Sequence, residues 1–370
     1  MADDRIGIDE IQSALSEAGY PWEAGVTDLS SLPLERQAQY LGVTPPPGEP
    51  SIEEIAQRAI EMKDQIREEA LSAVAAPAAY DWRNVGGQNF VTPVKNQSSC
   101  GSCVAFGAVA TVESRLRVQR NNPNLAVDLS EAHLFFCHAR ARGNNCSTGW
   151  WPEQAFDDFR DKGVADEACY PYNLSNTDCS GLCSDWASRV LKITGYTTLT
   201  SNPAGIKDWV STRGPVSACF VVYQDFYSYR TGVYRHVTGG QAGGHCVSIV
   251  GYDDSQGCWI CKNSWGPTWG DQGFFRIAYG ECAIDSWRNH GVDDIRNTGW
   301  QSNQLVIGLW TIDQDRNAWV YFRALGWRRI SPDNDNILFD MLAQLTAAKA
   351  AGRPVTFYEE DSVIKQVYVY

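Results

Sequence analysis

Long apolar segments are missing from this chain of 370 residues. No uncharged apolar run reaches about 18 residues, the length that a membrane-spanning helix requires. The acidic opening MADDRIGIDE does not fit an intact secretory signal peptide, which begins with basic residues. Positive charge is also scarce, since 31 Lys and Arg face 44 Asp and Glu. The net charge of −13 argues against nucleic acid or an anionic membrane as the main partner.

Cysteine is absent before Cys100 and after Cys282, although the chain holds 12 cysteines. The cysteines therefore mark out a central body. The loop-like stretch from Cys137 to Cys183 is especially rich in them, which is typical of disulfide-stapled loops and favours secretion or another oxidising compartment. The missing signal peptide points the other way, and we give the cysteine pattern more weight.

Most of the acidic excess lies in residues 1–79, which we call the leader. Its first 76 residues hold 15 acidic and 5 basic groups. After Pro50, an apolar stripe at helical spacing predicts an amphipathic helix that docks on another part of the protein. The stripe consists of Ile52, Ile55, Ala59, Met62 and Ile66. The alternative is a solvated spacer. The small residues of 71–80 are expected to stay extended and accessible to proteases.

The patterns after the leader predict two further domains. Residues 80–295 begin with a strong helix near 102–119 and continue through a loop-rich half. Their second half is strand-like, at 214–223, 245–252, 258–265 and 273–280. This order favours an α+β architecture with a cleft between two lobes. Residues 303–370 show three strands, a helix and two strands, an order that resembles a small OB-like β-barrel.

A candidate nucleophile lies in NQSSCGSCVAFGAVA, residues 96–110. A polar Gly/Ser turn ends at Cys103, where a helix is expected to begin. A thiol at a helix N-terminus meets the positive end of the helix dipole, which lowers the pKa of the thiol and favours the reactive thiolate. The alternative is an inert, buried helix residue, since most cysteines are of that kind.

His245 is the candidate base among the five histidines. It stands in QAGGHCVSIVGYDD, where Gly243 and Gly244 let a substrate backbone approach and a strand holds the ring. Downstream, CWICKNSWGPTWGDQGFF places Asn263 at a strand end. An amide there fixes the imidazole tautomer without neutralising the imidazolium. Trp265 is expected to shield the hydrogen bond between His245 and Asn263 from water.

These segments resemble the papain-like cysteine proteases over roughly residues 80–290. The resemblance rests on YDWRNVG, TPVKNQSSCGSCVAFG, LSEAHLFFC, CYPY, GHCVSIVGYD and KNSWGPTWGDQGFFRI. It implies a papain-like two-lobe fold, with a helical lobe and a β-barrel lobe. It also implies a cysteine endopeptidase that hydrolyses polypeptide substrates and needs neither a cofactor nor a metal.

The resemblance assigns a role to each of four residues. Gln97 supplies the side-chain donor of the oxyanion hole, together with the backbone N–H of Cys103. The imidazolium of His245 pairs with the Cys103 thiolate, and Asn263 orients His245. Two features depart from the family pattern, because Val104 replaces the usual aromatic residue after the nucleophile and Asn263 follows at a somewhat greater distance than usual. Neither departure changes one of the four residues to which the resemblance assigns a catalytic role.

The resemblance also suggests what surrounds the second substrate residue before the scissile bond. Trp150 and Trp151 are expected at the non-primed wall of the cleft, and a hydrophobic side chain is the expected occupant. The floor and end of this pocket are expected to come from Cys219, Gly243, Cys246 and Trp287. The alternative is that the tryptophans only pack the lobe.

The disulfide pairing follows from the resemblance rather than from spacing. Cys100 is expected to pair with Cys146 and Cys137 with Cys179, which leaves Cys169 and Cys183 as a further pair. Cys282 lacks the partner that the family often supplies. The CxxC formed by Cys258 and Cys261 imitates a zinc motif, but a strand would turn the two thiols to opposite faces, which argues against a metal site.

The remaining expectations concern the two ends of the chain. By resemblance, the leader is a helical inhibitory propeptide whose extended tail passes through the cleft, and cleavage between about Leu71 and Tyr80 releases the mature enzyme. The tail domain suggests a glycan, protein or self-association partner. Its aromatic residues line a sugar site unless they pack the core: Trp310, Trp319, Tyr321, Trp327 and Tyr358. The rival hypothesis is a catalytically silent papain-fold protein that binds peptides or glycans.

Overall fold

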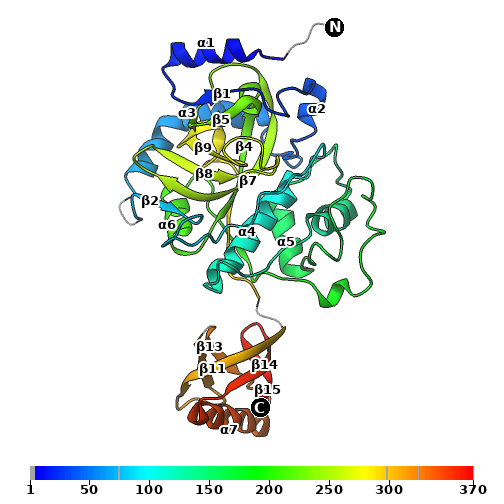
Figure 1. Ribbon diagram of the computed structural model, residues 1–370, viewed down its shortest axis with the longest axis vertical. Coiled ribbons are helices and arrows are strands. Elements are labelled where there is room, and N and C mark those ends of the chain that lie inside the picture. Colours follow the sequence, from blue (N-terminus) through cyan, green and yellow to red (C-terminus); the bar gives the residue numbers. More distant parts are fainter. Residues whose placement is uncertain (1–4, 74–75, 297–298, 324, 370) are drawn as a thin grey trace. The chain divides into compact units, whose positions relative to one another are not determined.

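The computed structural model describes residues 5–73, 76–296, 299–323 and 325–369. The chain divides into two compact units, Met1–Asp294 and Ile295–Tyr370 (Figure 1). Within the described residues, no helix combines the length and the apolar character that crossing a membrane requires.

The leader folds as three helices and a short strand within the first unit. These elements are α1 (Ile8–Ala18), β1 (Glu23–Ala24), α2 (Leu34–Ala38) and α3 (Ile52–Leu71). α1 ends at Gly19, whose φ of 66° lies in the left-handed region that glycine adopts without strain. α3 begins with a capping box, in which Ser51 and Glu54 each accept a hydrogen bond from the other's backbone N–H.

α3 is docked on the body of the first unit, as its amphipathic pattern predicts. The side chains buried along its length are those of Ala56, Ala59, Ile66 and Ala70. Lys63 of α3 forms an ion pair of 2.6 Å with Glu281, and the Lys207 ammonium donates to the carbonyl oxygen of Ala70 over 2.9 Å. The solvated-spacer alternative is therefore wrong for this helix.

The helical part of the body is built around α4 (Cys103–Gln119), the strong helix expected from the sequence. Every side chain from Cys103 to Leu116 is buried, because α4 contacts helices on one side and the strand β7 on the other. The other elements on this side are η1 (His133–Ala139), α5 (Pro152–Asp161) and η2 (Trp186–Ser188). A helix covered on all sides reads as apolar on every face, which residues 104–110 show. Further along, the buried Glu113 accepts from the Thr92 hydroxyl and Arg115 pairs with Asp294.

The β part of the body is one eight-stranded sheet with the order β3-β10-β4-β7-β8-β9-β6, and β2 pairs with β7 beside it. The strands are β2 (Ala79–Asp81), β3 (Tyr196–Thr198), β4 (Val216–Tyr223), β6 (Val233–Tyr234), β7 (Gln241–Asp253), β8 (Cys258–Lys262), β9 (Phe274–Ala278) and β10 (Asn289–Val292). α6 (Pro203–Thr212), η3 (Gln224–Ser228), β5 (Tyr229–Thr231) and η4 (Glu281–Ala283) complete this unit.

The leader shares the hydrophobic core of the sheet. Ile11, Leu15, Trp22 and Leu29 belong to the same buried cluster as the side chains of β4 and β7. β1 also pairs with β5, so leader backbone and body backbone form a common ladder. Removing the leader would therefore expose apolar surface that the body now covers.

The second unit is a closed barrel with the strand order β11-β12-β13-β15-β14. Its elements are β11 (Gly299–Thr311), β12 (Ala318–Phe322), β13 (Gly326–Ile330), α7 (Asp335–Ala351), β14 (Pro354–Glu360) and β15 (Val363–Val369). The expected order of three strands, a helix and two strands is confirmed. β11 begins at Gly299, four residues before the expected start of this domain. α7 is capped by Asn334 and ends at Gly352 in the left-handed conformation.

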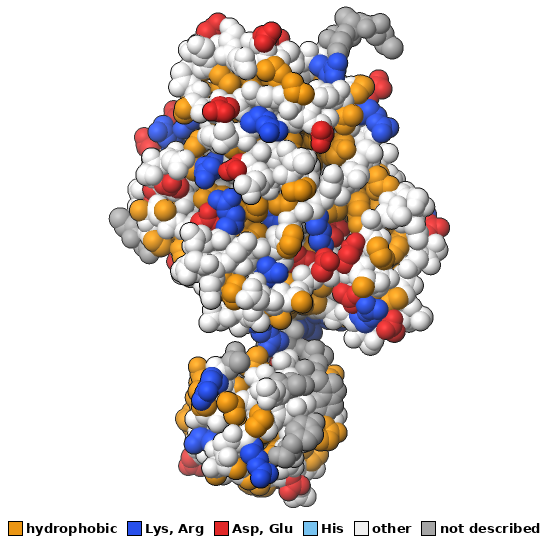
Figure 2. All heavy atoms as spheres, viewed as in Figure 1, with side chains coloured by type: hydrophobic (Ala, Val, Ile, Leu, Met, Phe, Trp, Pro, Cys, Tyr) orange, Lys and Arg blue, Asp and Glu red, His pale blue; other side chains and the backbone are white. Residues whose placement is uncertain are grey.

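Charged side chains of both signs are interspersed over the first unit on the face drawn in Figure 2. A polyanion such as nucleic acid binds best to a continuous positive surface. This face carries both signs of charge rather than one continuous positive patch.

Candidate active site

The candidate nucleophile Cys103 is the first residue of α4, directly after the N-cap Ser102. Its side chain is fully buried. The helix start thus points its free backbone N–H groups toward the thiol region, as the sequence predicts.

The candidate base His245 lies within β7, and the side chain of Asn263 follows directly after β8. The Nε2 atom of His245 and the Oδ1 atom of Asn263 are 2.8 Å apart. The Trp265 ring lies against the imidazole, with centroids 4.7 Å apart, and is almost fully buried, so it excludes water from this hydrogen bond. Nδ1 of His245 has no hydrogen-bond partner in the described part of the chain.

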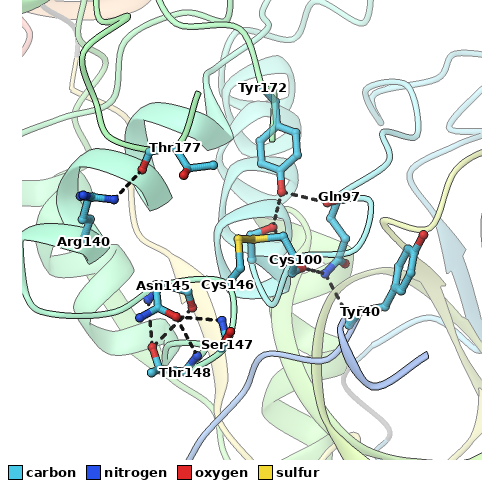
Figure 3. The surroundings of a disulfide bond; sticks show 11 residues. Tyr40, Gln97, Cys100, Arg140, Asn145, Cys146, Ser147, Thr148, Tyr172 and Thr177 are labelled. Carbon is cyan, nitrogen blue, oxygen red and sulfur yellow. Dashed lines mark hydrogen bonds between the residues drawn. A yellow bond between two sulfur atoms is a disulfide. The ribbon is translucent and has the colours of Figure 1, made fainter. Parts of the chain in front are cut away.

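Gln97 is held in one orientation by a hydrogen bond that the sequence did not reveal. The Ser264 hydroxyl donates to Oε1 of Gln97 over 2.7 Å, which turns the amide Nε2 toward the carbonyl oxygens of Cys100, at 2.8 Å, and Tyr40, at 3.0 Å. Figure 3 shows the amide between these two carbonyls. Ser264 sits next to Asn263 in the sequence, but only the fold brings it to Gln97.

The carbonyl of Tyr40 belongs to a leader segment that crosses the candidate site, residues 40–44. The backbone N–H groups of Gly42 and Val43 donate to the carbonyl oxygen of Gly244, each over 3.1 Å. Trp150 donates its backbone N–H to the Gly42 carbonyl over 2.7 Å. Val43 thereby runs antiparallel to Gly244 and parallel to Trp150. We call residues 40–44 the cleft segment.

Three glycines allow the cleft segment to approach this closely. A Cβ atom on Gly42 would lie 2.0 Å from the carbonyl oxygen of Gly101. A Cβ atom on Gly149 would lie 2.3 Å from the carbonyl oxygen of Gly42. Since these neighbours are backbone atoms, they cannot rotate away, and backbone approaches backbone here because side chains are absent.

The electrostatics of the covered site differ from the sequence expectation. Burial raises the pKa of the Cys103 thiol well above its usual value, and the nearby Cys246 thiol raises it further. Hydrogen bonds from the backbone N–H groups of Cys246, Gly42 and Val104 lower this pKa, but by less. Burial lowers the pKa of His245 to about 4. The helix start alone predicted a lowered thiol pKa, but desolvation by complete burial of the thiol outweighs it. Both groups are neutral in this form.

The tryptophans of the expected pocket wall lie in different places. The Trp150 side chain is fully buried, where its Nε1–H donates to Oε1 of Gln154 over 2.7 Å, so only the backbone of Trp150 faces the cleft segment. Its place in the pocket wall stays a prediction, because Cys103 and His245 are equally buried in this form. Trp151 is half-buried. The sequence could not tell which of the two tryptophan side chains is buried, because adjacent identical residues differ only in the direction in which the fold points their side chains.

The other expected pocket residues gather beside the cleft segment. A Cβ atom on Gly243 would lie 3.0 Å from the Leu41 side chain, and one on Gly244 would lie 2.7 Å from the tip of the Trp287 ring. Cys219 of β4 and Cys246 of β7 face each other in the ladder and are fully buried.

Three disulfides brace the helical lobe, and they are the expected pairs: Cys100–Cys146, Cys137–Cys179 and Cys169–Cys183. The first, drawn in Figure 3, joins the turn before Cys103 to the loop that carries Gly149. The backbone N–H of Gly101 also donates to the Cys146 carbonyl over 2.9 Å. Cys282 is free and buried.

Comparison with known proteins agrees with this geometry. The family described as "Papain family cysteine protease" matches residues 76–291. A gut-specific cysteine proteinase of Caenorhabditis elegans is 32% identical over 253 residues, which cover 60% of this chain and 76% of the relative. Pro-cathepsin H of Bos taurus is 38% identical over 212 residues, 55% of this chain and 61% of the relative.

Two solved proforms share the fold. Procathepsin B S9 from Trypanosoma congolense has a TM-score of 0.61 at 22% identity, covering 78% of this chain and 97% of that one. Digestive procathepsin L2 from the larval midgut of Tenebrio molitor has a TM-score of 0.60 at 28% identity, covering 77% of this chain and 88% of that one. With a family match over more than half its length and a leader folded onto its body, this chain belongs to the papain family of cysteine proteases and is a zymogen.

Proposed function

We propose that this zymogen matures into an endopeptidase in which Cys103 is the nucleophile and His245 the general base and acid. The observation that carries this proposal is the Gln97 amide, which donates to a backbone carbonyl oxygen, that of Tyr40, within 3.0 Å. An amide that binds the carbonyl of one peptide in this place is suited to the oxyanion of another.

The proposed reaction proceeds through a thioester. With the cleft segment gone, Cys103 transfers its proton to Nδ1 of His245, and the thiolate attacks the substrate carbonyl carbon. Gln97 and the backbone N–H of Cys103 donate to the oxyanion. His245 protonates the leaving amine, then takes a proton from water, which hydrolyses the thioester. Asn263 holds the proton on Nε2, so Nδ1 stays available for the transfer.

An epoxysuccinyl inhibitor tests this assignment against the silent-scaffold rival. After removal of residues 1–79, the protein should be labelled at Cys103, and Cys103→Ala should abolish labelling. Cys282→Ala, which removes another buried free thiol, is the matched control and should label normally. A protein that takes up no label after the leader is removed would favour the binding protein.

We further propose that residues 1–79 are the inhibitory propeptide, residues 80–295 the catalytic domain and residues 303–370 a separate small domain. The cleft segment supports the first assignment, and the pairing of β2 with β7 supports a mature chain that begins near Tyr80. Cleavage is proposed between Leu71 and Tyr80, where residues 74–75 lie outside the described ones. The test is the full chain carrying Cys103→Ala at acidic pH. If it shortens when incubated alone, self-processing is wrong.

The pocket for the second residue before the scissile bond is proposed to take a small hydrophobic side chain. Val43 and the tip of Trp287 both lie against Gly244, which supports an apolar pocket of limited depth. Cleavage of a peptide library should select valine or similar residues at that position. Trp287→Ala should shift the selection toward larger apolar residues.

The second unit is proposed to bind glycans through the outer face of β11, β12 and β13. Trp310 and Trp327 are 44% and 46% exposed, so core packing is wrong for these two. Trp319 lies opposite Trp310, and Tyr321 opposite Trp327, in neighbouring strands. Exposed aromatic faces stack on sugar rings, and OB-like barrels bind oligosaccharides on this side.

Binding of the full chain to insoluble polysaccharides tests the glycan proposal. Retention should fall for Trp310→Ala and Trp327→Ala but not for Phe339→Ala, which removes a still more exposed aromatic ring from α7. Equal retention of all three variants, or retention of none of the proteins, would contradict it and leave a protein ligand or self-association as the alternatives.

A further inference from the structure

Three free cysteines meet beside the proposed active site, although the reaction needs only one. Cys219 and Cys246 lie directly opposite each other in the antiparallel pair of β4 and β7. Such partners have Cα atoms about 4.5–5.5 Å apart, within the range of about 4.4–6.8 Å that a disulfide requires. Both side chains are fully buried, and the neighbouring Cys246 thiol is one of the causes that raise the pKa of Cys219.

The Cys246 sulfur also faces the helix that carries Cys103. A Cβ atom on Gly107 would lie 2.8 Å from that sulfur, so the missing side chain of Gly107 makes room for it. Gly107 is four residues after Cys103 and therefore on the same face of α4, about 6 Å further along the axis. The backbone N–H of Cys246 is hydrogen-bonded to the Cys103 sulfur. Cys246 thus stands between Cys103 and Cys219.

In the zymogen, the side chains of Cys219 and Cys246 are both closed off from solvent. Ser217, two residues before Cys219 on β4, places its hydroxyl 3.4 Å from the Cys246 sulfur. Cys103 itself is covered in the zymogen by the backbone of Gly42. Once the cleft segment leaves, an oxidant dissolved in water meets Cys103 first. No described group of metal-ligating side chains forms a metal site here.

We propose that Cys246 and Cys219 are a built-in reductant that restores the Cys103 thiol after a peroxide has oxidised it. This inference rests on the proposed role of Cys103. It adds a redox reaction within the protein that peptide hydrolysis does not require.

The reaction has three balanced steps. Hydrogen peroxide transfers one oxygen to the Cys103 thiolate, which forms a sulfenic acid and, after protonation of the leaving hydroxide, water. The Cys246 sulfur attacks the Cys103 sulfur, which forms a disulfide and releases a second water. The Cys219 sulfur then attacks Cys246, which leaves a Cys219–Cys246 disulfide. The proton of the Cys219 thiol passes to the departing Cys103 sulfur, which restores the Cys103 thiol. In sum, the two thiols of Cys219 and Cys246 reduce one hydrogen peroxide to two waters.

Proximity decides whether this sequence outruns further oxidation. Burial raises the pKa of the Cys219 thiol, which slows its attack compared with a solvent-exposed thiolate. Well-oriented neighbours reach effective concentrations of about 10⁵ M or more when the reacting atoms approach to about 3–3.5 Å. The Cys246 side chain therefore has to turn from Gly107 toward Cys103 for its attack to outrun a peroxide in solution. The internal thiols therefore react with the sulfenic acid before a second peroxide converts it to the irreversible sulfinic acid.

The test oxidises the self-processed mature enzyme with hydrogen peroxide, one equivalent at a time, without added reductant. Activity is expressed relative to the untreated sample of each variant, and disulfides are mapped by alkylation and mass spectrometry. Wild type should keep most of its activity after the first equivalent, contain a Cys219–Cys246 disulfide and lose activity with the next equivalent.

Two variants isolate the two steps. Cys246→Ala should be inactivated by the first equivalent and trapped by dimedone at Cys103. Cys219→Val should also be inactivated, but as a Cys103–Cys246 disulfide that a thiol reductant reverses. Cys258→Ala, which removes a buried thiol from β8, is the matched control and should behave as wild type.

The outcomes separate this inference from the proposed function. An untreated enzyme without activity or epoxysuccinyl labelling would overturn the role of Cys103. An active wild type that loses its activity with the first equivalent, or that forms no Cys219–Cys246 disulfide, would overturn the internal reductant alone. Because the disulfide map needs only wild type, the result stands even if a variant does not fold.

Discussion

Gly42→Ala should open the zymogen. The new Cβ atom would lie 2.0 Å from the Gly101 carbonyl oxygen, whereas an ordinary contact of this kind is 3.4 Å or longer. Gly101 cannot yield, because it is next to the Cys100–Cys146 disulfide and its N–H is bonded to the Cys146 carbonyl. The overlap must therefore be relieved by lifting the cleft segment.

The size of the effect follows from the cost of overpacking. One forced methyl group costs about 1–3 kcal/mol, which corresponds to about a 5- to 150-fold larger population of the open state. Labelling of Cys103 in the intact zymogen by an epoxysuccinyl probe at neutral pH reports that population, because only an open cleft admits the probe. Labelled full-length chain is separated from processed chain on a gel.

Gly7→Ala is the matched control, since a Cβ atom on this leader glycine meets nothing within 4 Å. It should be labelled at the wild-type rate. If Gly42→Ala were labelled no faster than Gly7→Ala, the close fit of Gly42 against Gly101 would not contribute to latency, and the reasoning from steric overlap would be refuted.

Three further predictions concern the same site. Ser264→Ala removes the hydrogen bond to Gln97, so kcat/KM should fall by about 5- to 150-fold, as expected for about 1–3 kcal/mol. Ser264→Thr keeps the hydroxyl and should retain most of the wild-type kcat/KM. An unchanged kcat/KM in Ser264→Ala would mean that the Gln97 amide does not need this hydrogen bond. Glu49→Gln weakens the leader's ion pair with Arg288, so labelling of the zymogen should rise about 2- to 5-fold for about 0.5–1 kcal/mol, and equal labelling would exclude this anchor. Burial lowers the pKa of His245 to about 4, so between about pH 6.5 and 4 this histidine is protonated in the unfolded chain but not in the folded chain. Acidification through this window should therefore lower the free energy of unfolding of a Cys103→Ala zymogen by up to about 3 kcal/mol. Denaturant unfolding at each pH measures this, and replacing His245 by Gln should reduce the dependence by this contribution, leaving that of His133, whose pKa burial lowers to about 3.

Local sequence patterns were sufficient for the elements that carry the candidate residues. The polar turn before Cys103 and the apolar run after it predicted the start of α4, and Asn334 and Gly352 bracketed α7, because capping acts over a few residues. The disulfides required the family resemblance, since spacing alone does not determine pairing.

Contacts between distant segments remained beyond the sequence. Ser264 reaches Gln97 only in the folded chain, and the meeting of the Tyr40 carbonyl with the same amide depends on the path of the leader. The raised pKa of the Cys103 thiol was missed for a related reason, because it follows from complete burial of the thiol in the folded chain, whose cover includes Gly42, 61 positions earlier in the sequence. Nothing near Cys103 in the sequence reports that neighbour.

The hydrogen bond between the Gln97 amide and the Tyr40 carbonyl couples inhibition by the leader to the rate of peptide cleavage. Under the proposed mechanism, the same amide donates to the Tyr40 carbonyl of the inhibitory leader in the zymogen and to the oxyanion of the substrate in the mature enzyme. A change that strengthens this donor would speed peptide cleavage and, by the same contact, delay release of the leader. Selection for a faster protease at this position therefore also selects for a slower activation. The two properties can be tuned apart only at residues such as Gly42, which belong to the leader and are absent from the mature enzyme.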